Sequence, residues 1–331
     1  MMFKIAGFLK TIATGFTATC LVQVAHAETI TVEGVYAARV DLPPDVELIL
    51  IDRFEGDLGQ DVELALTEVL GNVYIRGEPF FDLITPGALS TAVVEVEGND
   101  GNVSTRPLAP DAEFRGTVRS EVIEREVEPK RERECVKRDE DDKCIERREV
   151  RIECRELTVL VDPRLLLTGA SGEQLYAQSQ TRVAAKRFCA DENYVPSSLD
   201  MENELINALV DEIRHDLAPL QSRRGIRVME RRKDLRKEDR RPFREAVKAT
   251  DDNVTLACEG FAALEANNIA HVSVLFNIGL CHESAAKLEE AMDYYVRALE
   301  VDPGRDYPTD GLRRVRSRIR AEEHLADRAS L

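Results

Sequence analysis

The sequence has no tryptophan and few aromatic residues, which fill 5% of its 331 positions. The lack of tryptophan removes a common anchor of binding sites. Catalytic motifs are missing too: we find no phosphate-binding glycine loop, no G-x-S-x-G elbow, no H-E-x-x-H helix and no dinucleotide fingerprint. Carboxylates are plentiful, so a glycosidase-like pair stays open, but no two of them stand out as partners. We predict that the protein is not an enzyme and uses no cofactor or metal.

Long apolar stretches are limited to the N-terminal part, where two lysines precede an apolar run over 12–24 and the small-x-small triplet Ala25-His26-Ala27. This order is typical of a cleavable signal peptide, and the run is too short to span a bilayer comfortably. Cys20 lacks the aliphatic residue three positions upstream that a lipoprotein signal carries. We predict a signal peptide at 1–27, a mature start near Glu28, a periplasmic or secreted protein, and no transmembrane segment after signal removal.

Basic residues are in the minority, because 45 lysines and arginines stand against 62 aspartates and glutamates, a formal net charge of -17. Losing the two lysines of the signal peptide would make it -19, which is -17 minus 2. This charge disfavours generic binding to nucleic acid or to an anionic membrane. The partner we expect is an envelope protein or peptide, and a homo-oligomer stays open.

Six of the seven cysteines follow the predicted signal peptide, in a compartment that permits disulfides. The first two flank the polar tip VKRDEDDK, the next two lie almost equidistant from a Gly-Ala-Ser-Gly turn, and the last two fall on consecutive predicted helices. Zinc is the alternative, but no close C-x-x-C pair is present. We predict three disulfides: Cys135–Cys144, Cys154–Cys189 and Cys258–Cys281.

Apolar patterns predict a mixed α/β domain over 28–219. The expected elements are strands at 46–51 and 80–84, a helix at 57–70, a strand from Phe114, a hairpin of 157–167 with 174–182, and a helix at 198–217. The fold class expected for the whole chain is α+β, in which this domain carries a long projecting β-hairpin and is followed by an all-α helical array.

Four segments of this domain carry a resemblance: the strand and helix LILIDRFEGDLGQDVELALTEVL, the strand DAEFRGTVRS, the turn SGEQLYAQS and the final helix. Together, over about 45–219, they resemble the periplasmic domain shared by the curli-export lipoprotein CsgG, the penicillin-binding-protein activator LpoB and related envelope proteins. The resemblance implies a non-enzymatic module that docks on a partner or assembles into larger structures.

Residues 119–156 depart from that family, because about two thirds of them are charged, with both signs interleaved. Their two halves alternate like a long two-stranded ribbon, which is marginal in water by itself. A Cys135–Cys144 clasp would contribute on the order of 2–3 kcal/mol, against about 0.2–1 kcal/mol for a cross-strand ion pair. We predict a projecting arm for contact with another protein. A solvated or disordered loop is the alternative.

A basic segment follows the first domain, and we predict that 220–246 is a linker helix broken near Pro242. Its arginines form either a solvated face or a contact to an anionic envelope polymer or to the protein's own acidic surface. The six arginines concerned are Arg223, Arg224, Arg231, Arg232, Arg240 and Arg241.

Residues 271–303, HVSVLFNIGLCHESAAKLEEAMDYYVRALEVDP, resemble one complete tetratricopeptide repeat, two antiparallel helices that stack into peptide-binding arrays. His282 replaces the usual aromatic residue and is expected to pack rather than to act as a base. An ordinary helical hairpin is the alternative. The positions that match the repeat are Leu275, Ile278, Gly279, Ala291, Tyr295, Ala298 and Pro303.

The neighbouring sequence extends this repeat into a helical domain at 247–331. One repeat length upstream, Ala257 and Phe261 fall in register, whereas Arg241, Arg244 and Glu245 do not match. Downstream, the helical spacing of Leu312, Val315 and Ile319 predicts a capping helix.

The helical domain should bind a peptide on its concave face. We predict that this face presents Ser273, Phe276, Leu280 and Glu283, spaced about one helical turn apart. The protein would then be a non-enzymatic envelope scaffold. The alternatives are an activator of peptidoglycan synthesis, which the envelope-domain resemblance implies, and an envelope-polymer hydrolase.

Overall fold

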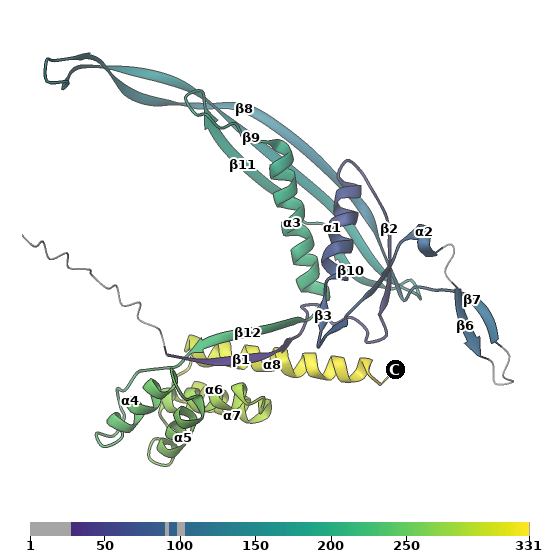
Figure 1. The fold of residues 1–331 in the computed structure, drawn as a ribbon, viewed down its shortest axis with the longest axis vertical. Coiled ribbons are helices and arrows are strands. Elements are labelled where there is room, and N and C mark those ends of the chain that lie inside the picture. Colours follow the sequence, from purple (N-terminus) through teal and green to yellow (C-terminus); the bar gives the residue numbers. More distant parts are fainter. Residues whose placement is uncertain (1–27, 90–92, 98–102, 331) are drawn as a thin grey trace, which may run out of the picture.

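The structure is a computed structural model that describes residues 28–89, 93–97 and 103–330; the predicted signal peptide at 1–27 lies outside the described residues. The chain is α+β, as expected (Figure 1). A sheet with a long arm occupies one end of the molecule, and a cluster of helices occupies the other. Among the described helices, none is both long and apolar enough to cross a membrane.

The main sheet has six strands in the order β10-β9-β8-β2-β5, with β11 also paired to β9. β2 is parallel to β5 and β8, and the other pairings in the sheet are antiparallel. β3 pairs with β4, and β6 with β7, as separate short hairpins. The bounds are β2 Leu48–Glu55, β3 Tyr74–Ile75, β4 Glu78–Pro79, β5 Asp82–Ile84, β6 Val93–Glu97, β7 Val103–Pro107, β8 Ala112–Arg138, β9 Cys144–Gly169, β10 Gln174–Gln178 and β11 Arg182–Cys189.

β10 and β11 pair with the same side of β9, one after the other, and Pro163 of β9 explains why the pairing is interrupted between them. The Leu58 N–H donates to the carbonyl of Val118 at 3.3 Å, so the backbone groups of Val118 point away from β9. Pro163 lies opposite Val118, and its own backbone groups therefore face the side of β10 and β11. Because proline has no N–H to donate, the pairing is interrupted between Gln178 and Arg182.

Helices α1 (Gly59–Gly71) and α3 (Ser198–Leu217) cover one face of the sheet (Figure 1). The bounds of α3 match the prediction, because Ser197 caps its first turn by accepting from the Asp200 N–H at 3.3 Å. The third helix of this part, α2, is a single turn at Pro86–Leu89. The core between helices and sheet includes Val62, Leu66, Phe114, Val118, Val159, Val161, Leu209 and Ile213.

The predicted linker helix at 220–246 is wrong. Residues Leu220–Arg227 form strand β12, which pairs antiparallel with β1 (Thr29–Tyr36) from Tyr36↔Leu220 to Thr29↔Arg227. A helix begins only at Arg240, and Pro242 lies in its first turn, where the missing N–H costs nothing. The partner strand lies about 190 residues away in sequence, so tertiary pairing overrides the local helical preference.

Five helices follow: α4 Arg240–Ala249, α5 Val254–Glu265, α6 Val272–Ser284, α7 Leu288–Val301 and α8 Asp306–Arg328. The residues predicted to pack in the repeat, Ala291, Tyr295 and Ala298, are fully buried. Gly279 permits the expected close approach, because a Cβ there would lie 2.8 Å from the Tyr295 ring. Upstream, α4 buries Phe243, Ala246 and Val247 in place of the unmatched arginines and glutamate.

The two cores of the molecule exchange elements, which corrects the predicted division at 219 and 247. Ile30 and Val32 of β1 belong to the core of the helical array, although they precede the α/β elements in sequence. In return, Ala321 near the end of α8 belongs to the core of the sheet. The β1–β12 ribbon and α8 therefore join the two parts of the chain.

Candidate partner-binding surfaces

The four residues predicted to contact a peptide are fully buried, so that prediction is wrong in this structure. Ser273, Phe276, Leu280 and Glu283 each have 0% exposed surface. The Phe276 ring lies between those of Tyr295 and Tyr307, with centroids 5.5 Å away in both cases. The face on which we expected a peptide is therefore covered by the chain itself.

Segments from outside the array supply that cover. The Ser284 hydroxyl donates to the carbonyl of Thr31 in β1 at 2.7 Å. Asn277, in the middle of α6, accepts from the Met229 N–H at 2.8 Å and donates to the Met229 carbonyl at 3.0 Å. The side-chain amide thus pairs with extended backbone much as a strand partner would. This face of the array therefore binds extended backbone from the same protein, at Met229 and at Thr31.

Glu283 joins three helices instead of facing a ligand. Arg314 of α8 donates to its carboxylate from Nε at 3.0 Å and from Nη2 at 2.7 Å, and the Tyr295 hydroxyl donates at 2.6 Å. Burial, followed by the nearby Glu283 charge, raises the pKa of Tyr295 well above its ordinary value. Arg318 adds a bond to the Glu283 backbone carbonyl at 2.9 Å. All these donors serve the fold.

His282 packs as expected for a substitute aromatic residue. Its ring stacks on that of Tyr294, with centroids 5.2 Å apart and planes at 13°. The Tyr294 hydroxyl donates to Glu265, and Arg297 pairs with the same carboxylate, both at 2.8 Å. The neighbourhood is thus a surface ion-pair cluster, which gives His282 a packing role.

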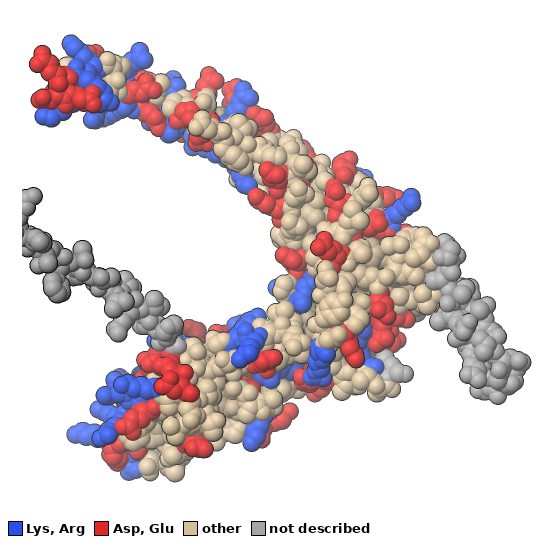
Figure 2. Space-filling view, viewed as in Figure 1, with Lys and Arg blue, Asp and Glu red and all other residues tan. Residues whose placement is uncertain are grey.

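The arm has the predicted hairpin structure, and all three predicted disulfides are present. The clasp Cys135–Cys144 closes the tip, where β8 and β9 are joined by 139–143. Figure 2 shows acidic and basic side chains interleaved along the arm and at its tip. Two apolar side chains next to the clasp, Val136 and Ile145, are 47% and 56% exposed. The tip therefore offers both charge and apolar surface to a partner.

The base of the arm is wider than predicted, because β11 runs beside β9 as a third strand as far as the Cys154–Cys189 disulfide. At this level the Arg187 side chain donates to the Glu128 carbonyl at 2.7 Å, and Lys130 pairs with Asp191 at 2.9 Å. Beyond Lys130 and Ile152 only two strands continue. We call residues 130–152 the free arm. Its part of β8, residues 130–138, has nine residues and is therefore about 30 Å long.

The six arginines of the basic segment mostly contact the protein itself. Ion pairs join Arg223 to Glu33 at 3.9 Å, Arg231 to Asp302 at 3.8 Å and Arg241 to Glu245 at 2.8 Å. Arg224 lies over the Tyr36 ring, and Arg240 donates to the Leu235 carbonyl. Arg232 is exposed. Contact with the protein's own acidic side chains, one of the predicted alternatives, accounts for three of them.

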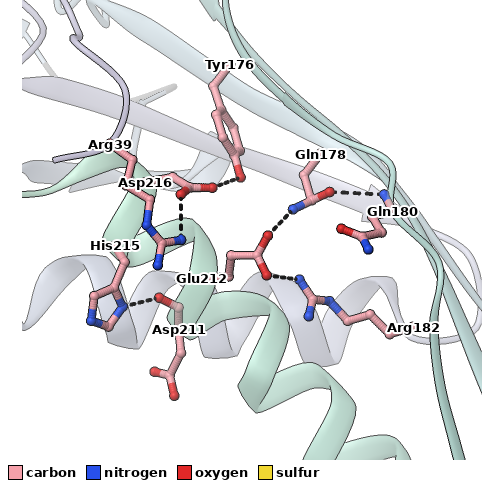
Figure 3. A network of polar contacts seen from close by, with 9 residues as sticks. All are labelled: Arg39, Tyr176, Gln178, Gln180, Arg182, Asp211, Glu212, His215 and Asp216. Atoms are coloured by element: carbon pink, nitrogen blue, oxygen red, sulfur yellow. Dashed lines mark hydrogen bonds and ion pairs between the residues drawn. The ribbon is translucent and has the colours of Figure 1, made fainter. Parts of the chain in front are cut away.

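A polar network links α3 to the edge strands β10 and β11 (Figure 3). Asp216 accepts from Tyr176 at 2.8 Å and from Arg39 at 3.1 Å. One turn away, Glu212 accepts from Gln178 at 3.0 Å and from Arg182 at 2.6 Å. The Arg182 hydrogen bond holds the pKa of Glu212 below its usual value. These two carboxylates lie four residues apart on one helix, and each accepts hydrogen bonds from two side chains outside that helix. The arrangement holds α3 to the edge strands of the sheet.

A cavity of about 460 Å³ lies where the end of α8 meets the sheet. Arg328 dominates it: the guanidinium lies 4.4 Å from the centre of the Phe80 ring and donates to the carbonyls of Val46 and Phe80 at 2.8 and 2.7 Å. It also pairs with Glu47 at 3.4 Å. Because its donors are engaged by the protein, Arg328 fixes α8 and is not poised for a ligand.

One group of metal-ligating residue types appears in the described part of the chain: Cys189, Asp191 and Glu192. The Cys189 sulfur is bonded to Cys154 and cannot act as a thiolate ligand. The two remaining carboxylates are exposed, and Asp191 is paired with Lys130. Cys189 and Asp191 therefore hold the base of the arm together, through the disulfide and the ion pair, and the group is not a good metal site.

No family model matches the chain, and no curated protein matches it either. Among solved structures, it is similar to a dodecamer of a PelC variant from Paraburkholderia phytofirmans, with 9% identity over 57% of this chain and 96% of the other, at a TM-score of 0.21. It is also similar to a protein described as a neuraminyllactose-binding hemagglutinin homolog from Helicobacter pylori, with 7% identity over 52% and 81% and the same TM-score of 0.21. At these TM-scores neither likeness bears on function, and the tetratricopeptide and CsgG-like resemblances stay predictions.

Proposed function

We propose that the protein is a non-enzymatic scaffold of the cell envelope that binds another envelope protein through the free arm. The observation that carries this proposal is that the β8–β9 ribbon continues as two strands past the end of β11. One disulfide lies near the tip of this ribbon and another at its base. A two-stranded ribbon has no core of its own and gains little stability in water. Two covalent links at such an element favour a role that needs it ordered.

The burial of the array face supports the choice of the arm over the array. Phe276 and Leu280 are fully buried, and Tyr307 of α8 lies against the Phe276 ring. On the same helix, Asn277 is bonded to Met229 and Ser284 to Thr31 of β1, so a peptide could reach this face only after these segments had moved away from α6. The tip, by contrast, is accessible as it stands. Val136 and Ile145 supply apolar contact area, and the interleaved charges around them supply specificity.

The test is site-specific photo-crosslinking in the native envelope from Asp141 at the arm tip, followed by mass spectrometry of the products. Asp252, an exposed aspartate in the turn between α4 and α5, is the matched control. We expect a reproducible protein adduct from Asp141 that is absent from Asp252. The absence of an adduct from Asp141, in a protein whose three disulfides are intact, would contradict the proposal.

A truncated variant extends the test. Replacing 129–152 by an Asn-Gly turn removes the free arm and its clasp but keeps the Cys154–Cys189 disulfide. The truncated protein should fold and fail to co-purify with the partner identified by cross-linking. If that partner makes peptidoglycan, stimulation of the purified enzyme by the intact protein would support the activator alternative. Turnover of an envelope polymer by this protein alone would instead support the hydrolase.

A further inference from the structure

A stretch of β8 between the body and the free arm has an edge that no described strand covers. β2 pairs with β8 only as far as Thr117, and the regular pairing of β8 with β9 is broken by an irregularity after Val127. Between these limits, 119–127 forms a regular strand with β9 on one side only. A strand of this kind presents a row of unpaired backbone donors and acceptors.

The direction of each backbone group along this edge follows from two hydrogen bonds. The Ala170 N–H donates to the Asp111 carbonyl, so the odd-numbered residues of β8 bond to β9. The Leu58 N–H donates to the Val118 carbonyl from the opposite side, so the even-numbered residues point outward. No irregularity interrupts the pairing of β8 with β9 from Ala112 to Val127. The outward groups are therefore those of Ser120, Val122, Glu124 and Glu126.

The side chains of the stretch divide between the two faces of the sheet in the same alternation. Val118 is in the core and Ser120 bonds to Glu202 of α3, so even-numbered side chains lie on the helix-covered face. Arg119, Glu121, Ile123, Arg125 and Val127 lie on the other face. Val122 and Ile123 are exposed by 47% and 41%, so each face of this stretch presents one apolar side chain to solvent.

We propose that this edge pairs with the same edge of a second copy, antiparallel and centred on Ile123, to form a twofold dimer. The inference goes beyond the proposed function, which concerns the free arm and a different protein. Ile123 is the midpoint of 119–127, so a centre there places the whole free edge of one copy against that of the other. Outward groups meet outward groups in this register, because Val122 faces Glu124 and Ser120 faces Glu126.

The charges select this register over its neighbours. With Ile123 on the twofold axis, Glu121 of each copy faces Arg125 of the other, and the two Ile123 side chains meet on one face. A centre at Val122 would place Arg119 opposite Arg125, and a centre at Glu124 would place two glutamates opposite each other. Within the described chain Glu121 lies opposite Leu160 and forms no ion pair. Arg125 pairs with Glu156 at 2.6 Å and would then lie between two carboxylates.

A cross-link tests the register directly. Ile123→Cys should form an intersubunit disulfide under oxidising conditions, because facing residues in a non-hydrogen-bonded pair have Cα atoms about 4.5 Å apart. The matched control is Arg119→Cys on the same strand and face, whose counterpart in the dimer would lie about 26 Å away. Covalent dimer from Ile123→Cys alone, on a non-reducing gel, is the expected result. Equal yields from both variants, or none from Ile123→Cys, would overturn the register.

Backbone and charge variants test the interface by analytical ultracentrifugation of the full mature chain. Val122→Pro removes an outward N–H without touching the bonds to β9 and should give a monomer, whereas Val122→Thr should still dimerise. Glu121→Arg should weaken the dimer about 2- to 30-fold, and Glu121→Arg with Arg125→Glu should restore part of it. A wild-type protein that is monomeric throughout the concentration series, or a dimer that survives Val122→Pro, would overturn the proposal.

Discussion

Tyr295 lies between two glycines, one in α6 and one in α8, and its hydroxyl reaches a buried carboxylate. A Cβ at Gly279 or Gly311 would come within 2.8 or 2.7 Å of the ring, so the two helices can close on the tyrosine only because both positions lack a side chain. The Glu283 carboxylate, with 0% exposed surface, takes one bond from Tyr295 and two from Arg314. Removing a donor here leaves a buried charge less well compensated.

Tyr295→Phe should therefore lower the free energy of unfolding by about 1–3 kcal/mol, measured by urea denaturation followed by circular dichroism. Tyr294→Phe is the matched control, since the neighbouring hydroxyl makes a bond of similar length to Glu265, whose side chain is 27% exposed and keeps its Arg297 pair. Its loss should cost less, because water can replace the donor. If the two substitutions lowered the free energy of unfolding equally, the buried hydrogen bond to Glu283 would stabilise the protein no more than the partly exposed one to Glu265.

His324 should make stability depend on pH near neutrality. Burial, followed by the nearby Arg328 charge, holds its pKa below the ordinary value of 6.5, and its ring lies 6.1 Å from that of Phe80. The unfolded chain therefore binds a proton more readily than the folded one, so stability is full above about pH 6.5 and falls as the pH drops toward the lowered pKa. His324→Gln should flatten that part of the curve in urea titrations from pH 7.5 to about 5. An unchanged slope in the variant would rule His324 out as its source.

Single elements differ in how far the sequence determines them. α3 begins at a serine cap and ends before Pro219, and the prediction matched it residue for residue. The cysteine pairs were equally local, since each pair closes a hairpin or joins neighbouring elements. β1 was missed although Ile30 and Val32 alternate, because its partner β12 lies at the other end of the α/β part and nothing local indicates that pairing.

The misplaced peptide-binding face has a different cause. α6 is buried on every side, from Val272 through Leu280, and a helix that is apolar all round is typically enclosed. The sequence VSVLFNIGL carries that signal, whereas the repeat pattern predicts that only one face of this helix packs inward. Asn277, the single strongly polar residue in this stretch, marked where extended backbone would be held. What could not be predicted is that the chain itself supplies that backbone.

The clasp at the arm tip can be tested as an element. The double substitution Cys135→Ser with Cys144→Ser should raise amide hydrogen exchange within 130–152, because a two-stranded ribbon without a clasp frays. The thermal midpoint of the body should stay within a few degrees, since its core residues lie outside the free arm. An arm that stays protected in this double variant would mean that cross-strand ion pairs such as Arg131–Glu149 suffice.

The matched variant replaces Cys154 and Cys189 by alanine. This pair joins β9 to the end of β11 at the base of the arm, and both residues are buried. Its loss should lower the thermal midpoint of the body and raise exchange in β11 as well as in the arm. A midpoint unchanged in this variant would show that the base is held by the hydrogen-bonded ladder alone.

At the scale of the whole molecule, the ends of the described chain tie the two cores together. β1 places Ile30 and Val32 in the helical core and Val35 in the sheet core, and α8 does the same with Val315 and Ala321. The Ala37 N–H, directly after β1, donates to both the carbonyl and the hydroxyl oxygen of Ser317 in α8, at 3.1 and 3.0 Å. Because β1 and α8 each contribute residues to both cores, the loss of either element would expose apolar residues of the helical core and of the sheet core.

The two cores should therefore unfold as one unit. Ile30→Ala, in a fully buried position of the helical core, should cost about 2–5 kcal/mol. In hydrogen exchange under mild denaturant, protection should then fall by the same amount in α3 and β9 as in α6 and α7, although Ile30 does not belong to the sheet core. Leu64→Ala, at a position that is 61% exposed on α1, should leave both unchanged. If protection fell only in α4–α8 and the β1–β12 ribbon, the helical array would be an independent unit, and its buried face could open for a peptide while the sheet and its arm stayed folded.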